Sequence, residues 1–221
     1  MDKDSTESLC TALRFLVRSG LVDYNGHASV RVPNGFVINS GASNRAAPQS
    51  SEMTQMSLDG DVLSGPRPPN ECHLHAAIYQ ARPDVRAIVH GHPKWICTLT
   101  TAGHGLAPVM PQGALVAGLP RYEHAHSIST AARGAAVADT LGQARGALLM
   151  GHGLVMTGSD IVAACVLALY AEQTAERQVC AAPIGGARLL PDDEIAEYRK
   201  TLDSPGLFAK CWEFYLTRQG D

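Results

Sequence analysis

The stretch Ala87-Ile88-Val89-His90-Gly91-His92 is an apolar run that ends in two histidines separated by one residue. In an extended strand, residues i and i+2 point to the same side, so the two imidazoles would lie together. Imidazole nitrogen is a common ligand of divalent metals, and a catalytic centre typically uses three protein ligands and leaves one position open. The stretch therefore predicts a buried strand that ends in part of a metal site.

A third histidine and a glutamate extend this pattern on either side of the stretch. His152 lies in the tripeptide 151–153, Gly-His-Gly, directly after the apolar run 147–150. Glu71 comes before the helical segment that leads into the strand. Three histidines, an open coordination position and a carboxylate suit metal-assisted chemistry on a small substrate with oxygen ligands.

Other histidines offer weaker alternatives. His124 and His126 repeat the i, i+2 spacing, but they lie in a polar segment without an apolar strand before it. His73 and His75 would lie on different faces of one helix, so the two cannot bind the same metal. His75 is one helical turn from Glu71, where it could orient the carboxylate or join the metal shell.

Helix and strand signals alternate along the rest of the chain. Strands are predicted at 30–32 and 36–38, around the turn Pro33-Asn34-Gly35, and in a hairpin over 147–156. Residues 108–118 read as strand and loop. Helices are predicted from apolar spacing and caps, with Asn70 as the cap of the second, at 7–18, 71–82, 93–100, 127–141, 160–180, 192–202 and 208–215. This order predicts one domain over 1–221 with an α/β fold, a three-layer α/β/α arrangement around a mixed sheet.

Composition excludes several classes of protein. The 221 residues are 45% hydrophobic with a net charge of −3, and no Lys or Arg run predicts a nucleic-acid patch. The longest apolar run, 161–171, is shorter than the roughly 20 residues of a membrane helix. The acidic, polar start is unlike a signal peptide, and the six scattered cysteines are typical of reduced core residues. We expect a soluble, cytoplasmic protein that binds neither nucleic acid nor membrane.

Taken together, the motifs resemble the class II aldolase/adducin family. The resemblance rests on Pro69-Asn70-Glu71, His75-Ala76-Ala77-Ile78-Tyr79, Arg82-Pro83-Asp84-Val85, Val89-His90-Gly91-His92-Pro93 and Gly151-His152-Gly153. It is strengthened by Gly26-His27-Ala28-Ser29-Val30-Arg31, by Ser40-Gly41 and by the long helix that carries Glu172, and it spans about residues 8 to 216.

The resemblance implies a fold, a cofactor and an assembly. The fold would be the family's three-layer class II aldolase-like fold around a mixed, mainly antiparallel sheet. His90, His92 and His152 would hold a divalent metal, zinc or else manganese, cobalt or iron, and Glu71 would be the catalytic acid/base. The family's C4 homotetramer would place active sites between subunits, which makes Tyr215 a candidate catalytic residue, with simple packing of the last helix as the alternative. Adducin heads share the fold without the metal site.

Departures from the family pattern concern the substrate. Sugar-phosphate members of the family bind phosphate through an asparagine where this chain has His27, and through two serines where it has Pro69 and Asn70. Of that set only Ser29, Ser40 and Gly41 remain, and proline has neither an N–H nor a hydroxyl to donate. His27, Asn70, Ser40 and Arg45 could hold a carboxylate instead. The alternative for Arg45 is a solvated loop residue, and the alternative for His27 is the cap of a turn.

These features favour a decarboxylase of a small, unphosphorylated hydroxy-carboxylate, similar to the family's enzymes for hydroxylated aromatic or pyridine dicarboxylates. The metal would act as a Lewis acid, and protonated Glu71 would deliver a proton to the carbon that loses CO2. A helix start and a dication lower the pKa of Glu71 and burial raises it, so its resting state stays open. The alternatives are retro-aldol cleavage, dehydration of a hydroxy ketone, and a non-catalytic adducin-like module.

Overall fold

The computed structural model describes residues 3–217 and is built around one eight-stranded sheet. The strand order is β4-β3-β2-β1-β5-β8-β7-β6, and every neighbouring pair is antiparallel except β6 and β7. The strands are β1 (His27–Val32), β2 (Gly35–Asn39), β3 (Met53–Met56), β4 (Val62–Ser64), β5 (Ala87–Gly91), β6 (Arg121–Tyr122), β7 (Gly146–Leu149) and β8 (Gly153–Gly158). The expected mixed, mainly antiparallel sheet is confirmed.

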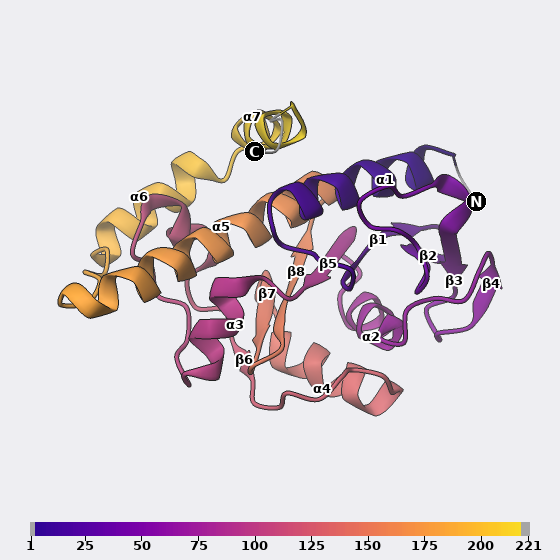
Figure 1. The fold of residues 1–221 in the computed structure, drawn as a ribbon, viewed down its shortest axis with the longest axis horizontal. Coiled ribbons are helices and arrows are strands. Elements are labelled where there is room, and N and C mark those ends of the chain that lie inside the picture. Colours follow the sequence, from indigo (N-terminus) through magenta and orange to yellow (C-terminus); the bar gives the residue numbers. More distant parts are fainter. Residues whose placement is uncertain (1–2, 218–221) are drawn as a thin grey trace.

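Helices cover both faces of the sheet and make three layers (Figure 1). One face packs against α1 (Lys3–Arg18), α3 (Lys94–Thr101) and α5 (Ile161–Ala181), with α7 (Pro205–Thr217) against α1 and α5. The other face packs against α2 (Cys72–Ala81) and α4 (Ala131–Leu141). The remaining helical segments are α6 (Asp192–Leu202) and the short 3-10 turns η1 (Ser50–Glu52), η2 (Pro111–Val116) and η3 (Ala182–Ile184).

Strand alternation decides which side chains face the α2 layer. On β5, Val89 belongs to the core beneath α1 and α5, whereas Ile88 belongs to the core beneath α2. His90 therefore shares the α2 side with Ile88, because side chains two residues apart point the same way. In the antiparallel register of β1 and β5, His27 lies opposite His90, so both imidazoles project toward α2.

Two local predictions were wrong. Glu71 rather than Asn70 is the cap residue of α2, and the Asn70 side chain instead accepts a hydrogen bond from Arg67. Residues 111–116 form the 3-10 segment η2 where strand and loop were expected. In addition, α4 begins at residue 131, where the Thr130 side chain caps it, later than its predicted start at 127.

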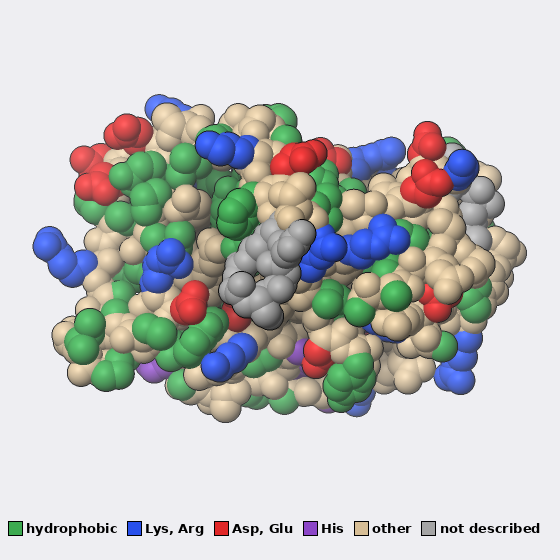
Figure 2. All heavy atoms as spheres, turned by 45° about the horizontal axis from the view of Figure 1, so that its top comes forward, with side chains coloured by type: hydrophobic (Ala, Val, Ile, Leu, Met, Phe, Trp, Pro, Cys, Tyr) green, Lys and Arg blue, Asp and Glu red, His purple; other side chains and the backbone are tan. Residues whose placement is uncertain are grey.

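The surface carries charges of both signs. On the face drawn in Figure 2, Lys and Arg side chains lie interspersed with Asp and Glu among apolar groups. Within residues 3–217, none of the helices combines the length and apolar character needed to cross a membrane.

Candidate metal centre and active site

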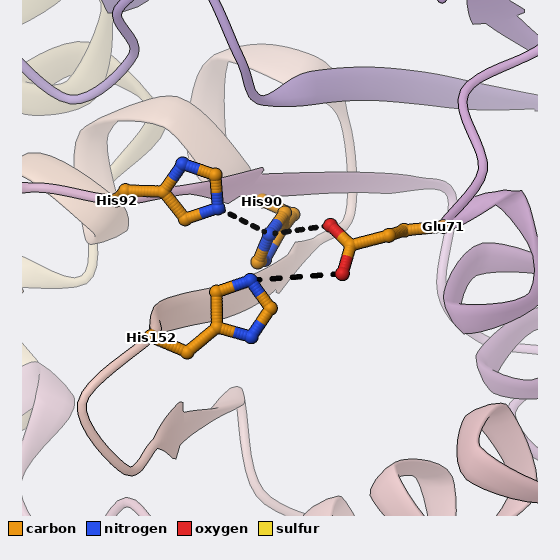
Figure 3. A group of neighbouring side chains, drawn as sticks. All are labelled: Glu71, His90, His92 and His152. Atoms are coloured by element: carbon orange, nitrogen blue, oxygen red, sulfur yellow. Dashed lines mark hydrogen bonds and ion pairs between the residues drawn. The ribbon is translucent and has the colours of Figure 1, made fainter. Parts of the chain in front are cut away.

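Four side chains from three parts of the chain converge at one end of the central strands (Figure 3). His90 lies near the end of β5 and His92 directly follows that strand, while His152 lies in the turn between β7 and β8. Glu71 approaches from the start of α2. One nitrogen or oxygen atom from each of the four lies within 4.8 Å of all the others. These are the same four residues that the sequence analysis combined into one candidate site.

The geometry of the histidines suits a divalent cation. Nε2 of His90 lies 3.2 Å from Nε2 of His92. Nδ1 of His90 lies 2.9 Å from the carbonyl oxygen of Leu154, which can only accept, so Nδ1 carries the proton and Nε2 presents a lone pair to the cluster. Burial lowers the pKa of His92 to about 4 and also lowers the pKa of His152. Neutral imidazoles whose nitrogens converge are the protonation state that metal binding requires.

Glycines allow the close approach of the turn that carries His152. A Cβ atom on Gly153 would lie 2.1 Å from the carbonyl oxygen of Gly91, and the φ of Gly153 is +157°. A side chain at this position would push the turn away from β5. Gly91 and Gly153, which lie beside the metal-site histidines, are thus required by backbone contact, because only glycine lets two backbones meet at this distance.

Glu71 is held as an acceptor at the base of the site. The backbone N–H of Ile128 donates to its Oε1 at 2.7 Å, and its Oε2 lies 3.3 Å from Nε2 of His90. Burial by itself would raise the pKa of Glu71, but contacts with His27 and His90 lower it more, and the net pKa lies well below the usual range. These contacts favour an ionised Glu71 in the resting protein, a state that the sequence left open.

Glu172 lies outside the four-residue cluster and holds the start of α3, the helix that follows His92. Its two carboxylate oxygens accept hydrogen bonds from the backbone N–H groups of Trp95 and Ile96, at 2.8 and 2.9 Å. These N–H groups belong to the first turn of α3, which starts directly after His92 and Pro93. A buried carboxylate at a helix start fixes that turn and therefore the chain that leaves His92. The sequence marked Glu172 as a family feature but offered no signal for this contact.

A pocket of about 560 Å³ opens beside the four-residue cluster. Its lining includes most of the predicted binding residues, namely His27, Gly41, Arg45, Asn70, Glu71, His92 and His152. Ser29 and Ser40 are buried and do not line this pocket. The Ser29 hydroxyl instead lies within hydrogen-bond distance of His75 and Tyr79, so the expected direct contact of Ser29 with a substrate does not fit its position.

Arg45 is a buried cation at the pocket wall, not a solvated loop residue. Its side chain is 5% exposed, and it donates to the carbonyl oxygens of Gly26 and Gly41, each at 3.1 Å. Among residues 3–217, no ion pair joins it to a carboxylate. Glu52 and Asp23 act on this buried guanidinium only from longer range, so the adjoining pocket is suited to an anion.

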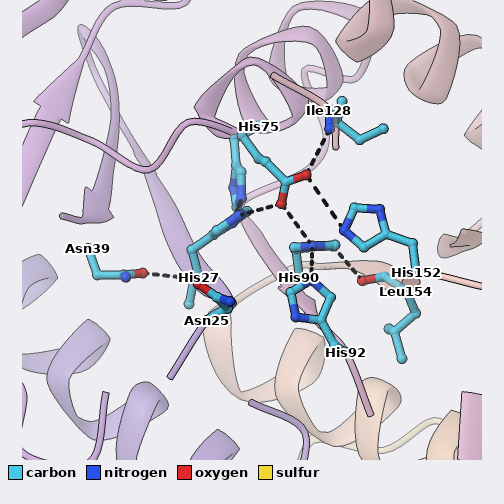
Figure 4. A network of polar contacts seen from close by, with 12 residues as sticks. Asn25, His27, Asn39, His75, His90, His92, Ile128, His152 and Leu154 are labelled. Carbon is cyan, nitrogen blue, oxygen red and sulfur yellow. Dashed lines mark hydrogen bonds and ion pairs between the residues drawn. The ribbon is translucent and has the colours of Figure 1, made fainter. Parts of the chain in front are cut away.

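The remaining candidates lie outside the cluster. Tyr215 packs against Phe15 and accepts a hydrogen bond from Gln173 at 3.0 Å, away from the pocket lining of its own chain. His126 lies 3.0 Å from the Tyr122 hydroxyl, and the alternative pair His124 and His126 does not join the four-residue cluster. His75 does not join it either; it contacts His27 from behind (Figure 4).

Comparison with known proteins places these features in a family context. Residues 7–179 match the sequence profile described as "Class II Aldolase and Adducin N-terminal domain". The chain is 30% identical over 209 residues to 3,4-dihydroxyphthalate decarboxylase from Arthrobacter keyseri, covering 86% of this chain and 84% of that protein. It is 29% identical over 152 residues to 5-deoxy-D-ribulose 1-phosphate aldolase from Bacillus thuringiensis serovar kurstaki, covering 68% and 71%.

The fold is also found among solved structures. An L-fuculose 1-phosphate aldolase superposes with a TM-score of 0.84 at 23% identity, over 92% of this chain and 98% of that one. The match shows the same three-layer architecture.

Proposed function

The chain belongs to the class II aldolase and adducin family, whose related enzymes support lyase activity, and we propose that it is a divalent-metal-dependent decarboxylase of a small hydroxy-carboxylate. The observation that carries this proposal is one pocket that combines the cluster of three histidines and Glu71 with the buried guanidinium of Arg45. The first group suits a metal and a proton transfer, and the second suits a substrate carboxylate.

His90, His92 and His152 are the residues that would hold the metal, which we expect to be zinc or else manganese, cobalt or iron. Three imidazoles with one open position fit such an ion. When bound, the ion supplies Lewis acidity toward the substrate's oxygen atoms. The relative affinities and the availability of the metals, more than the type of ligand, decide which one is bound, so loading experiments must compare zinc, manganese, cobalt and iron.

The other pocket residues favour an unphosphorylated substrate. Three prolines, Pro66, Pro68 and Pro69, line the pocket, and none has an N–H to donate to a phosphate oxygen. Arg45 would bind a carboxylate, with His27 and Asn70 on the same wall as further partners for substrate oxygens. The decarboxylase relative from Arthrobacter keyseri has a hydroxylated aromatic dicarboxylate in its name, which supports the same substrate class.

Glu71 would take one proton from the substrate and then return it to a different atom. As an ionised carboxylate it removes the proton of the substrate hydroxyl, and the bond between the skeleton and the carboxylate then breaks heterolytically. The electron pair stays on the carbon skeleton and CO2 leaves. Protonated Glu71 returns the proton to that carbon and becomes a carboxylate again. The first step starts from the ionised carboxylate that the low pKa of Glu71 favours.

We also propose the family's homotetramer, in which Tyr215 of one subunit would reach the active site of a neighbour. The packing of α7 on the outside of α1 and α5 leaves this tyrosine at the periphery of its own subunit, which is compatible with such a role.

The test is CO2 release from a panel of dihydroxyphthalates and hydroxypyridine dicarboxylates, with metal-loaded protein and a chelator control. We expect CO2 that depends on the metal and disappears in Glu71→Gln while the metal content is unchanged. Released aldehyde from hydroxy-carbonyl substrates, without CO2 from any acid, would instead identify retro-aldol cleavage, which the same cluster and the aldolase relative favour as the alternative. Turnover that survives both chelation and Glu71→Gln would reject both reactions.

A further inference from the structure

Behind the pocket, one face of α2 and one face of β1 interleave their polar side chains. Glu71, His75 and Tyr79 are spaced four residues apart on α2, and His27 and Ser29 are two apart on β1. Four helical residues advance about 6 Å and two strand residues about 6.7 Å, so the two spacings stay in step. Figure 4 shows His75 directly behind His27, on the side away from His90 and His92.

The interleaved groups form a continuous polar chain. The Tyr79 hydroxyl lies 2.9 Å from Oγ of Ser29, and that oxygen lies 2.6 Å from Nδ1 of His75. Nε2 of His75 in turn lies 2.7 Å from Nδ1 of His27. All four side chains are 3% exposed or less, so protein groups alone must satisfy them.

Both histidines of this chain are shielded from water, which disfavours their charged imidazolium form. Burial also raises the pKa of Tyr79, so its hydroxyl keeps its proton. Each of the four groups therefore carries one movable proton at neutral pH, and each of the three contacts needs one proton.

Proton counting leaves three arrangements. If His75 donates to His27, its Nδ1 must accept from Ser29, and Ser29 must then accept from Tyr79. If His27 donates to His75, Nδ1 of His75 donates to Ser29, and the last contact is filled either by Ser29 donating to Tyr79 or by Tyr79 donating to Ser29. The spare proton then lies on the hydroxyl of Tyr79 or of Ser29. Both histidines carry their proton on Nε2 in the first arrangement and on Nδ1 in the other two.

The surroundings select the first arrangement. In the other two, the spare hydroxyl proton of Tyr79 or Ser29 would need an acceptor, and within residues 3–217 these two hydroxyls have hydrogen-bond contacts only with each other and with His75. In the first, the spare proton sits on Nε2 of His27, which lies 3.6 Å from Oε2 of Glu71. That distance is too long for a hydrogen bond, but an N–H facing a carboxylate is attractive, whereas a lone pair facing it is repulsive.

Nε2 of His27 is buried beside Glu71 in the wall of the pocket, and among residues 3–217 it has no hydrogen-bond partner. We propose that Tyr79, Ser29 and His75 form a relay that holds His27 as an Nε2–H donor for an anionic substrate oxygen beside Glu71. His75, Ser29 and Tyr79 are positioning residues in this scheme, and His27 alone contacts the substrate. The role rests on the proposed function, but the tautomer of His27 does not.

The first experiment reads the tautomers directly and needs no substrate. Long-range 1H–15N correlation spectra of the zinc-loaded, full-length protein with 15N-labelled histidine distinguish Nδ1–H from Nε2–H rings. Loss of one ring's signals in His27→Gln and of another's in His75→Gln assigns the two residues. We expect both rings as Nε2–H. An Nδ1–H form for either ring would overturn the proposal, whether or not a decarboxylase activity has been found.

The second experiment tests the positioning role once a substrate is known. His75→Leu removes both contacts from a buried position of similar volume, and we expect kcat to fall about 10- to 100-fold with KM changed less than about twofold. In His75→Gln the side-chain amide can still donate to His27, so part of kcat should return. Unchanged kcat in His75→Leu, or equal loss in both variants, would refute the relay.

A milder variant protects the test against misfolding. Tyr79→Phe removes only the terminal hydroxyl, and we expect it to keep zinc and lower kcat a few-fold. Tyr198→Phe, the same change on the half-buried face of α6, is the matched control and should leave kcat unchanged. Equal kcat values for the two tyrosine variants would argue against the relay even if His75→Leu cannot be purified.

Discussion

Glu172→Gln tests how the α3 start supports the metal centre. Glu172 is 8% exposed, and its two oxygens accept from the N–H groups of Trp95 and Ile96. The glutamine amide keeps its oxygen as an acceptor for one of these two backbone N–H groups, but it places its own NH2 donor against the other. The variant therefore loses one charge-assisted hydrogen bond and the favourable charge at the helix start, together about 3 kcal/mol of the free energy of unfolding.

Urea unfolding of the metal-free protein at pH 7 and fixed protein concentration measures this cost. With a slope of about 2 kcal/mol per molar urea, the midpoint should fall by about 1.5 M. Glu176→Gln, one turn further along α5 and exposed, is the matched control and should shift the midpoint by less than about 0.3 M.

The same variant should weaken zinc binding. Because His92 is separated from the capped turn only by Pro93, loosening that turn lets the ligand move, and zinc affinity should fall about 10-fold. Titration against a fluorescent zinc chelator measures this directly. A urea midpoint equal to that of Glu176→Gln would refute the capping argument, and a lower midpoint with unchanged zinc affinity would refute its link to the metal site.

Three further results are expected. The free energy of unfolding of the metal-free protein should fall as the pH drops from about 6.5 to about 4, because His27 binds a proton in this range in the unfolded chain but not in the folded one. Its folded pKa of about 4 corresponds to a loss of about 3 kcal/mol. A urea midpoint that does not change with pH would contradict this. Gly153→Ala should abolish stoichiometric zinc binding by forcing its turn off Gly91, whereas Gly105→Ala, with open space around it, should bind zinc normally by elemental analysis. Arg45→Met should raise the KM of a carboxylate substrate about 100-fold with zinc content intact, and Arg45→Lys should recover part of it; equal KM values in both variants would argue against a charge interaction.

Much of the fold followed from local patterns. The apolar run before His90, the helix signal over 192–202 and the hairpin around 151–153 each depend on neighbours in sequence, and the structure confirms them. The cap of α2 could not be predicted in this way. Asn70 is a good capping residue by type, but the helix begins after Glu71, whose carboxylate accepts a hydrogen bond from Ile128, far away in sequence.

The sequence by itself determined the residues that meet at the cluster of Glu71, His90, His92 and His152, because residue type and spacing mark them without knowledge of distant contacts. Only the tertiary structure decided what surrounds them. The register of β1 against β5 brings His27 beside His90, and the matched advance of α2 and β1 joins His75 and Ser29 into a buried chain. Such contacts depend on how elements some 50 residues apart are packed, and neither periodicity nor composition carries that information.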